Sequence, residues 1–112
     1  MTRMTRGTPS PAEVLGICIE QDGERTICRI RGELDSINAP RLRAVLVERI
    51  ESNVVVDLSE LEFIDSSGLG VLVGALKRFD ASGHRLTLRS PTSAIQRVFA
   101  ITGLDQAFVI ED

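Results

Sequence analysis

Two serines stand between a carboxylate and a glycine in the segment Asp65-Ser66-Ser67-Gly68, directly after a run of apolar residues. Residues of these types can form a plain helix cap, a hydrolytic site, a cradle for a bound phosphate, or a place where a phosphate is attached. A plain helix start explains Asp65 well, because its side chain can accept a hydrogen bond from an amide of the first turn. It explains two adjacent serines less well.

A serine hydrolase would need a base close to the nucleophile. The single histidine, His84, lies just past the helix that Asp65 would begin, about four turns away. The nucleophile-elbow pattern also requires a glycine two residues before the serine, where this chain has Ile64. The sequence therefore argues against hydrolytic chemistry.

A nucleotide-binding domain is the next alternative. Gly68, Gly70 and Gly74 follow an apolar run and come close to the dinucleotide-binding pattern, but a lone glycine pattern is weak. That pattern expects an acidic residue near the end of the next strand, and the strand here ends in Leu88-Arg89-Ser90. The glycines inside the helix are better interpreted as packing glycines that let it lie close to a sheet.

A phosphate acceptor is the remaining alternative. A serine in the first turn of a helix lies among backbone amides that have no intrahelical acceptor, at the positive end of the helix dipole. A phosphate there adds about −1.5 to −2 charges without unfolding the domain. A partner protein bound at that place would face a new dianion. A serine of this segment would thus fit a binding module that phosphorylation switches off.

The elements that would position this segment alternate between strands and helices. We expect strands at 14–20, 25–31, 54–58, 85–89 and 107–110. Asp22-Gly23 predicts a hairpin between the first two strands, and Gly32 breaks the second. Helices are expected after Asn38 or Asp35 with Pro40 in the first turn, from Asp65 to Gly83, and from Ser90-Pro91 to Gly103.

The order β-β-α-β-α-β-α-β predicts an α/β fold with a mixed five-strand sheet: an N-terminal antiparallel hairpin, then parallel strands, packed with three or four helices. A length of 112 residues and 43% apolar content suit one domain, expected over 13–112. Residues 1–12 are expected to be a disordered tail. Segment 54–58 is almost wholly apolar, as in a central strand covered on both faces.

Composition excludes several classes of function. The chain has no Trp or Tyr and a net charge of −3, which argues against a nucleic-acid-binding surface. No signal peptide or membrane span is recognised, so a cytoplasmic location is expected. Cys18 and Cys28 are interpreted as reduced and mostly buried, because a zinc site would need more ligands than these and His84.

Several segments in this order resemble one known family. They are Ile30-Arg31-Gly32-Glu33-Leu34-Asp35, Ala39-Pro40, Val55-Val56-Asp57-Leu58-Ser59, Phe63-Ile64-Asp65-Ser66-Ser67-Gly68-Leu69-Gly70, Ser90-Pro91 and Gly103-Leu104. Over residues 13–111 the chain resembles the STAS domain, and specifically the bacterial anti-sigma factor antagonists. The combination of the Gly-Glu-Leu-Asp and Asp-Ser-Ser-Gly-Leu motifs at this separation carries the resemblance.

The resemblance implies a binding protein without catalytic residues, metal or cofactor. In this family the unphosphorylated antagonist binds an anti-sigma factor that is also a serine kinase, and so releases the sigma factor. The kinase inactivates the antagonist by phosphorylating the first serine after the aspartate, and a serine phosphatase restores it. That serine corresponds to Ser66. The partner-binding surface is expected to comprise Asp35, Asp65, Ser66, Ser67, Gly68 and Leu69.

The family also leaves alternatives open. Asp65 would cap its helix and Ser67 would help to shape the start of that helix, while Asp35 either contacts the partner or caps the helix that follows it. Leu69 is expected to belong more to the core than to the contact. Other STAS domains are non-enzymatic subunits of transport or stress-signalling complexes, and this role is the main alternative to a sigma-factor switch.

Overall fold

The computed structural model describes residues 14–112, which form five strands, three α-helices and one short 3-10 helix. In chain order the elements are β1 (Leu15–Asp22), β2 (Arg25–Leu34), α1 (Ala39–Val47), β3 (Asn53–Ile64), α2 (Ser66–Ser82), β4 (Leu86–Arg89), α3 (Ser93–Thr102), the 3-10 helix η2 (Leu104–Gln106) and β5 (Val109–Glu111). The predicted order of strands and helices is confirmed. The predicted tail, residues 1–12, lies outside the described residues.

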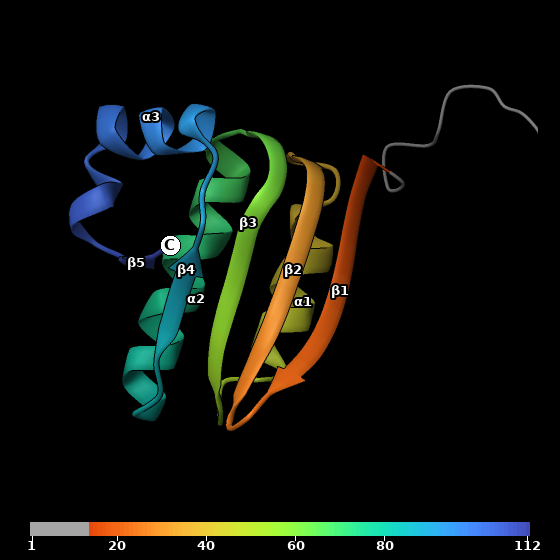
Figure 1. Cartoon of the computed structure of the whole chain (residues 1–112), viewed down its shortest axis with the longest axis vertical. Coiled ribbons are helices and arrows are strands. Elements are labelled where there is room, and N and C mark those ends of the chain that lie inside the picture. The colour runs from red at the N-terminus through yellow and green to blue at the C-terminus, as the bar shows by residue number, and fades with distance from the viewer. Residues whose placement is uncertain (1–13) are drawn as a thin grey trace, which may run out of the picture.

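All five strands belong to one sheet with the order β1-β2-β3-β4-β5. β1 and β2 are antiparallel and joined by the two-residue turn Gly23-Glu24, and every later pair is parallel. A helix supplies the crossover between successive parallel strands, as parallel pairing requires. The predicted mixed sheet with an N-terminal hairpin is therefore confirmed, and β3 is its central strand (Figure 1).

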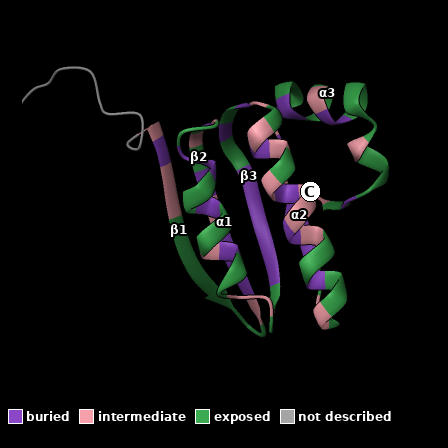
Figure 2. Cartoon of the chain, turned by 180° about the vertical axis from the view of Figure 1, so that it is seen from behind, coloured by how far each residue is buried: buried purple, intermediate pink, exposed green. Residues whose placement is uncertain are grey.

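The hydrophobic core lies between the sheet and the two helices α1 and α2, which cover the same face (Figures 1 and 2). Figure 2 shows β3 buried along most of its length, whereas the outer sides of both helices are exposed. The largest side chains buried in this core include Phe79, Phe99, Leu42, Leu46, Leu58 and Leu72.

No helix within residues 14–112 has the length and apolar character needed to cross a bilayer.

Several predicted boundaries are wrong. The strand predicted at 54–58 runs from Asn53 to Ile64 as β3, and two other errors have a local cause. Gly32 does not end β2, because its left-handed φ of +98° lets the strand bulge and continue to Leu34. A Cβ there would lie 1.9 Å from the carbonyl oxygen of Val14, so only glycine fits. Ser90-Pro91 does not open α3, because the hydroxyl of Thr92 accepts the amide of Ile95 and caps the helix two residues later.

The interpretation of Gly70 and Gly74 as packing glycines is also wrong. A Cβ added at Gly70 would meet nothing within 4 Å, and one at Gly74 would meet only the end of the Arg78 side chain, 3.6 Å away. Both residues therefore face open space on the outer side of α2. The close approach to the sheet occurs instead at Gly68, in the first turn of the helix.

The two cysteines have different environments. Cys28 is fully buried, and burial raises the pKa of its thiol to about 11, so the thiol stays protonated at neutral pH. Cys18 is exposed, which corrects the expectation that it is buried. Both thiols are free. Cys18 lies opposite Arg29 in the register of β1 and β2, and Cys28 lies opposite Ile19, so the two cysteines point to opposite faces of the sheet.

The other face of the sheet is covered by charged side chains instead of a helix. Ile27 and Val55 are neighbours in the register of β2 and β3 and lie outside the core under the helices, yet they are only 3% and 0% exposed. Six charged side chains surround them, and we call this set the charge ring. It consists of Glu20 of β1, Arg25 and Arg29 of β2, Asp57 of β3, Arg89 of β4 and Glu111 of β5.

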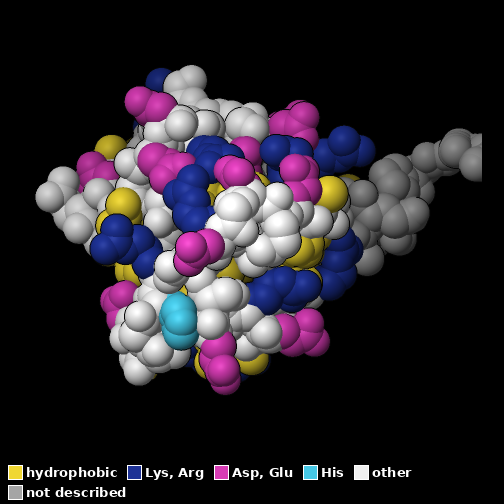
Figure 3. Space-filling model, turned by 60° about the horizontal axis from the view of Figure 1, so that its bottom comes forward, with side chains coloured by type: hydrophobic (Ala, Val, Ile, Leu, Met, Phe, Trp, Pro, Cys, Tyr) yellow, Lys and Arg dark blue, Asp and Glu magenta, His cyan; other side chains and the backbone are white. Residues whose placement is uncertain are grey.

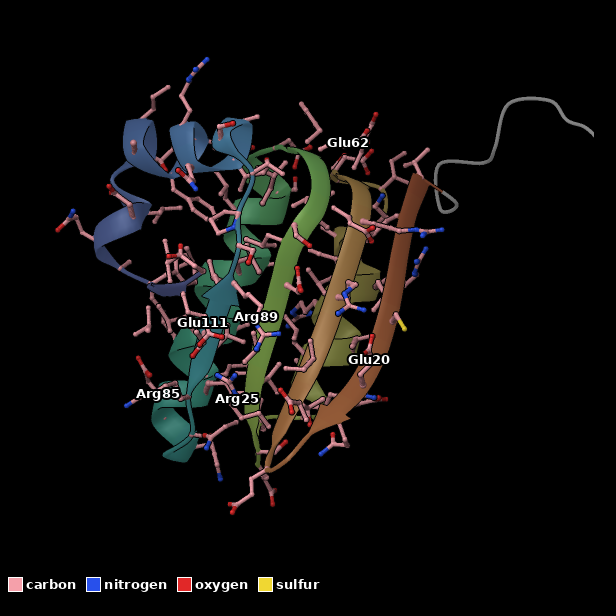
Figure 4. All side chains as sticks on the ribbon, in the orientation of Figure 1. Glu20, Arg25, Glu62, Arg85, Arg89 and Glu111 are labelled. Carbon is pink, nitrogen blue, oxygen red and sulfur yellow. The ribbon has the colours of Figure 1, made fainter. Side chains whose placement is uncertain are left out.

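The charge ring links every strand of the sheet. Arg29 pairs with Glu20 and lies 3.7 Å from the Asp57 carboxylate, while Glu111 accepts hydrogen bonds of 3.0 Å from both Arg25 and Arg89. Figure 4 shows Arg25, Arg89 and Glu111 close together on the helix-free side. The aliphatic stems of the arginines can cover the apolar residues beneath, while their guanidinium groups tie the edge strands β1 and β5 to the centre.

Two carboxylates of the charge ring, Asp57 and Glu111, are stabilised in their charged form. Burial alone would raise the pKa of Asp57, but the amide and hydroxyl of Ser59 and the nearby guanidinium groups outweigh it and lower the pKa. The hydrogen bonds from Arg25 and then Arg89 lower the pKa of Glu111. Acid should therefore weaken the attachment of β5.

Replacing Glu111 with Gln is expected to lower the free energy of unfolding by about 0.5–1 kcal/mol at pH 7, the usual range for partly exposed ion pairs. The folded-state pKa lies below the usual value of 4.5, so the stabilisation is present above that value and is lost as the pH falls through the folded-state pKa. Urea unfolding at pH 7 and pH 3 should show a difference from wild type that shrinks in acid. Glu51→Gln, at an exposed position, is the control; an equal effect of both substitutions would contradict the role of the ring.

Candidate functional site

Two loops meet at the carboxyl ends of β2 and β3. The loop from β2 to α1 spans residues 35–38, and β3 passes into α2 at Asp65. Because β2 and β3 are parallel neighbours, both connections leave the same edge of the sheet, at the upper end in Figure 1. The sheet order therefore brings Asp35 and the Asp-Ser-Ser-Gly segment, both assigned to one partner-binding surface by the resemblance, to the same edge.

Asp65 occupies the centre of this arrangement. Its Oδ1 accepts the amide of Gly68 at 3.0 Å, which confirms the predicted N-cap of α2. Its Oδ2 accepts the amide of Ser36 at 3.2 Å, and its own amide donates to the carbonyl of Leu34 at 3.1 Å. One aspartate thus joins the start of α2 to the end of β2 and to the loop that follows it.

Ser66 is the first residue of α2, and it is exposed. Its hydroxyl is therefore accessible to another protein, as a modification site requires. The amides of Ser66 and Ser67 belong to the first turn, which has no intrahelical acceptors, so a phosphate here would lie at the positive end of the helix dipole. Ser67 is half-buried and less accessible than its neighbour.

Gly68 and Leu69 lie on the inner side of the helix start. Gly68 is buried, and a Cβ there would lie 2.7 Å from Cγ of Leu34 and 2.8 Å from Cγ1 of Ile64. Leu69 is partly buried and packs against the core. The contribution of these two predicted residues is to seat the helix against the sheet, which places Ser66 at its surface.

Asp35 shapes its own loop. Its Oδ1 accepts the amides of Ile37 and Asn38 at 3.0 and 3.2 Å, and its carbonyl accepts the amide of Ala39 as α1 begins. These bonds hold the turn that leads into α1, whose N-cap position is Asn38 without a side-chain cap. Asn38 is buried and braces the loop from within, donating to the carbonyl of Glu33 and accepting the amide of Asp35.

Sequence reasoning missed two exposed apolar residues close to Asp65, one along the chain and one in the loop that Asp65 binds. Ile37 is 63% exposed in the β2–α1 loop, and Phe63 is 48% exposed two residues before Asp65. Large apolar side chains with this exposure beside a polar motif are candidates for partner contact. The sequence could have indicated Ile37, because it is a large apolar residue between the polar residues Ser36 and Asn38 in a segment expected to be a loop.

The described residues give no support to a hydrolytic, metal or nucleotide-binding site. The cleft lined by His84, Asp80 and Arg85 has a volume of about 800 Å³ and lies at the far end of α2 from Ser66. Acidic and basic side chains are interspersed over that lower end (Figure 3). Within residues 14–112, no three His, Cys, Asp or Glu side chains are grouped so that they could hold a metal ion. Gly68, Gly70 and Gly74 lie inside α2, not in a turn before it, so they form no phosphate-binding loop.

The sequence matches the STAS domain family model over residues 17–112. An anti-sigma-B factor antagonist of Listeria monocytogenes is 33% identical over 96 residues, which cover 83% of this chain and 84% of that protein. The chain therefore belongs to the STAS domain family, and the resemblance to anti-sigma factor antagonists predicted from its motifs is confirmed.

Solved structures agree with this assignment. The anti-sigma factor antagonist SpoIIAA in its unphosphorylated form superposes with a TM-score of 0.72 at 26% identity, covering 85% of this chain and 87% of that one. The Bacillus cell fate determinant SpoIIAA in its phosphorylated form gives a TM-score of 0.67 at 26% identity, covering 85% and 90%. The predicted fold is confirmed by both, and SpoIIAA is a similar protein that exists in two phosphorylation states.

Proposed function

We propose that this protein is an anti-sigma factor antagonist that acts by binding and is switched off by phosphorylation of Ser66. The observation that carries the proposal is the exposed hydroxyl of Ser66 at the first position of α2, directly after the Asp65 cap. Membership of the STAS family and the names of its relatives support it. The unphosphorylated chain binds a cytoplasmic anti-sigma factor, which then releases its sigma factor.

The switch rests on simple electrostatics. A phosphate on Ser66 adds about −1.5 to −2 charges at a helix N-terminus that tolerates negative charge, so the domain stays folded. A protein bound over the same residue would have to bury that dianion, or leave it unpaired, on contact. Binding is therefore lost although the fold is retained.

The protein's own part in this cycle is to bind, not to catalyse. The only histidine, His84, follows the far end of α2 from Ser66, so no base stands ready to activate the serine. Phosphate transfer then depends on the partner, an anti-sigma factor with serine kinase activity that carries ATP. A serine phosphatase reverses the modification and makes the antagonist active again.

Incubation with a serine-kinase anti-sigma factor of the same organism and ATP, followed by peptide mass mapping, tests the proposal. We expect one phosphate on the peptide that contains Ser66, none in Ser66→Ala, and unchanged modification of Ser66 in Ser67→Ala. Modification found only at another residue, or none with any such kinase of the organism, would refute the proposed function. Co-purification with a membrane transport complex instead would favour the scaffold role.

A further inference from the structure

The carboxylate of Asp65 holds two segments that are far apart in the sequence. Oδ1 accepts the amide of Gly68 in α2, and Oδ2 accepts the amide of Ser36 in the β2–α1 loop, 29 residues earlier. Both oxygens therefore have backbone donors from this chain. Asp65 is arranged to hold its own backbone in place more than to bind another protein directly.

The loop held by Asp65 presents one large apolar side chain. Ile37 is 63% exposed and directly follows Ser36, while its own amide donates to Oδ1 of Asp35 at 3.0 Å. Asn38, the next residue, is buried and hydrogen-bonded to Glu33 and Asp35. The backbone around Ile37 is thus fixed on both sides, so this part of the loop loses little further backbone freedom when a partner covers it.

Ile37 and Ser66 are each one residue away from the hydrogen bond between Ser36 and Asp65. We infer that Asp65 is a positioning residue: its carboxylate holds Ile37 beside the Ser66 hydroxyl, so that the anti-sigma factor binds both with one surface. This inference rests on the proposed function. The occupant is the anti-sigma factor itself, which covers Ile37 with an apolar pocket next to the place where it reaches Ser66.

Asp65→Asn separates the two hydrogen bonds of the carboxylate. Asparagine is as good an N-cap as aspartate, so its oxygen can keep the Gly68 amide. Its NH2 group then faces the Ser36 amide, and two donors cannot bond each other. We expect faster hydrogen exchange at the Ser36 amide in the isolated variant, with little change at the start of α2. Unchanged exchange at Ser36 would overturn the positioning role.

A double-mutant cycle with the purified anti-sigma factor tests the link to binding. Ile37→Ser and Asp65→Asn should each weaken binding roughly 10-fold, and the double variant should lose far less than the roughly 100-fold expected from independent effects. Non-additivity is expected because the serine substitution removes a contact that Asp65→Asn has already displaced. Ile19→Ser makes the same chemical change on β1 and should leave the affinity near that of the wild type.

The outcomes separate this inference from the proposed function. Full additivity, or an Ile37→Ser variant that binds as the wild type does, would overturn the inference while the phosphorylation of Ser66 still stands. Failure of the wild-type chain to bind any anti-sigma factor would refute the proposed function and the docking role of Ile37 together. In that case exchange at Ser36 still decides whether Asp65 holds the loop.

Discussion

Replacing Ser66 with Glu is expected to weaken binding to the anti-sigma factor by about 2 kcal/mol or more, roughly 30-fold. The carboxylate places a permanent negative charge where the partner must come into contact, and burying it unpaired is costly. Ser66→Ala should bind as tightly as the unmodified wild type and should stay bound in the presence of ATP, because no dianion can form. Calorimetric titration of the three proteins with the partner measures both effects.

The fold offers a matched control for this prediction. Ser93 is the first exposed residue of α3, directly after the Thr92 cap, just as Ser66 follows Asp65 in α2. Ser93→Glu adds the same charge at an equivalent helix position and should leave the affinity unchanged. Both glutamate variants should unfold near the wild-type midpoint, because each charge lies at a helix N-terminus. Equal affinity of wild type, Ser66→Ala and Ser66→Glu would place Ser66 outside the contact.

Local sequence rules were sufficient to predict the helix start that carries Ser66. The cap at Asp65, the exposed serine after it and the left-handed Gly83 that ends α2 all depend on residues within one or two turns. The sheet order followed in the same way, because strands that alternate with helices allow few topologies. Family motifs then singled out Ser66 and the anti-sigma factor partner, which geometry alone does not supply.

Contacts between distant segments were beyond reach of the same rules. The bond from Ser36 to Asp65 and the ion pair of Arg25 with Glu111 join residues 29 and 86 positions apart, and each depends on the register of neighbouring strands. The apolar pattern of segment 54–58 indicated a strand buried on both faces. It did not indicate that side chains of the charge ring would cover the face on which Val55 lies. Such pairings become visible only once the strands are placed in register.

The contacts of the glycines in α2 also could not be predicted from the sequence, and they are the basis of the second prediction. Gly68→Ala is expected to lower the free energy of unfolding by about 2 kcal/mol, because its Cβ would lie 2.7–2.9 Å from the side chains of Leu34 and Ile64 and must push the helix start away from the sheet. Gly74→Ala and Gly70→Ala should each raise it by roughly 0.5–1 kcal/mol, because a methyl group there meets open space and alanine favours the helix.

Urea unfolding of the three alanine variants measures these opposite signs on one helix. Because Gly68 seats the first turn that carries Ser66, Gly68→Ala should also slow phosphorylation of Ser66 under conditions in which the variant remains folded, whereas Gly74→Ala should not. Neutrality of Gly68→Ala would mean that α2 does not lie against Leu34 and Ile64 at its first turn, and destabilisation by Gly74→Ala would mean that a methyl group at Gly74 is not tolerated on the outer side of the helix. The close contact at Gly68 therefore fixes the position of the helix turn that carries Ser66.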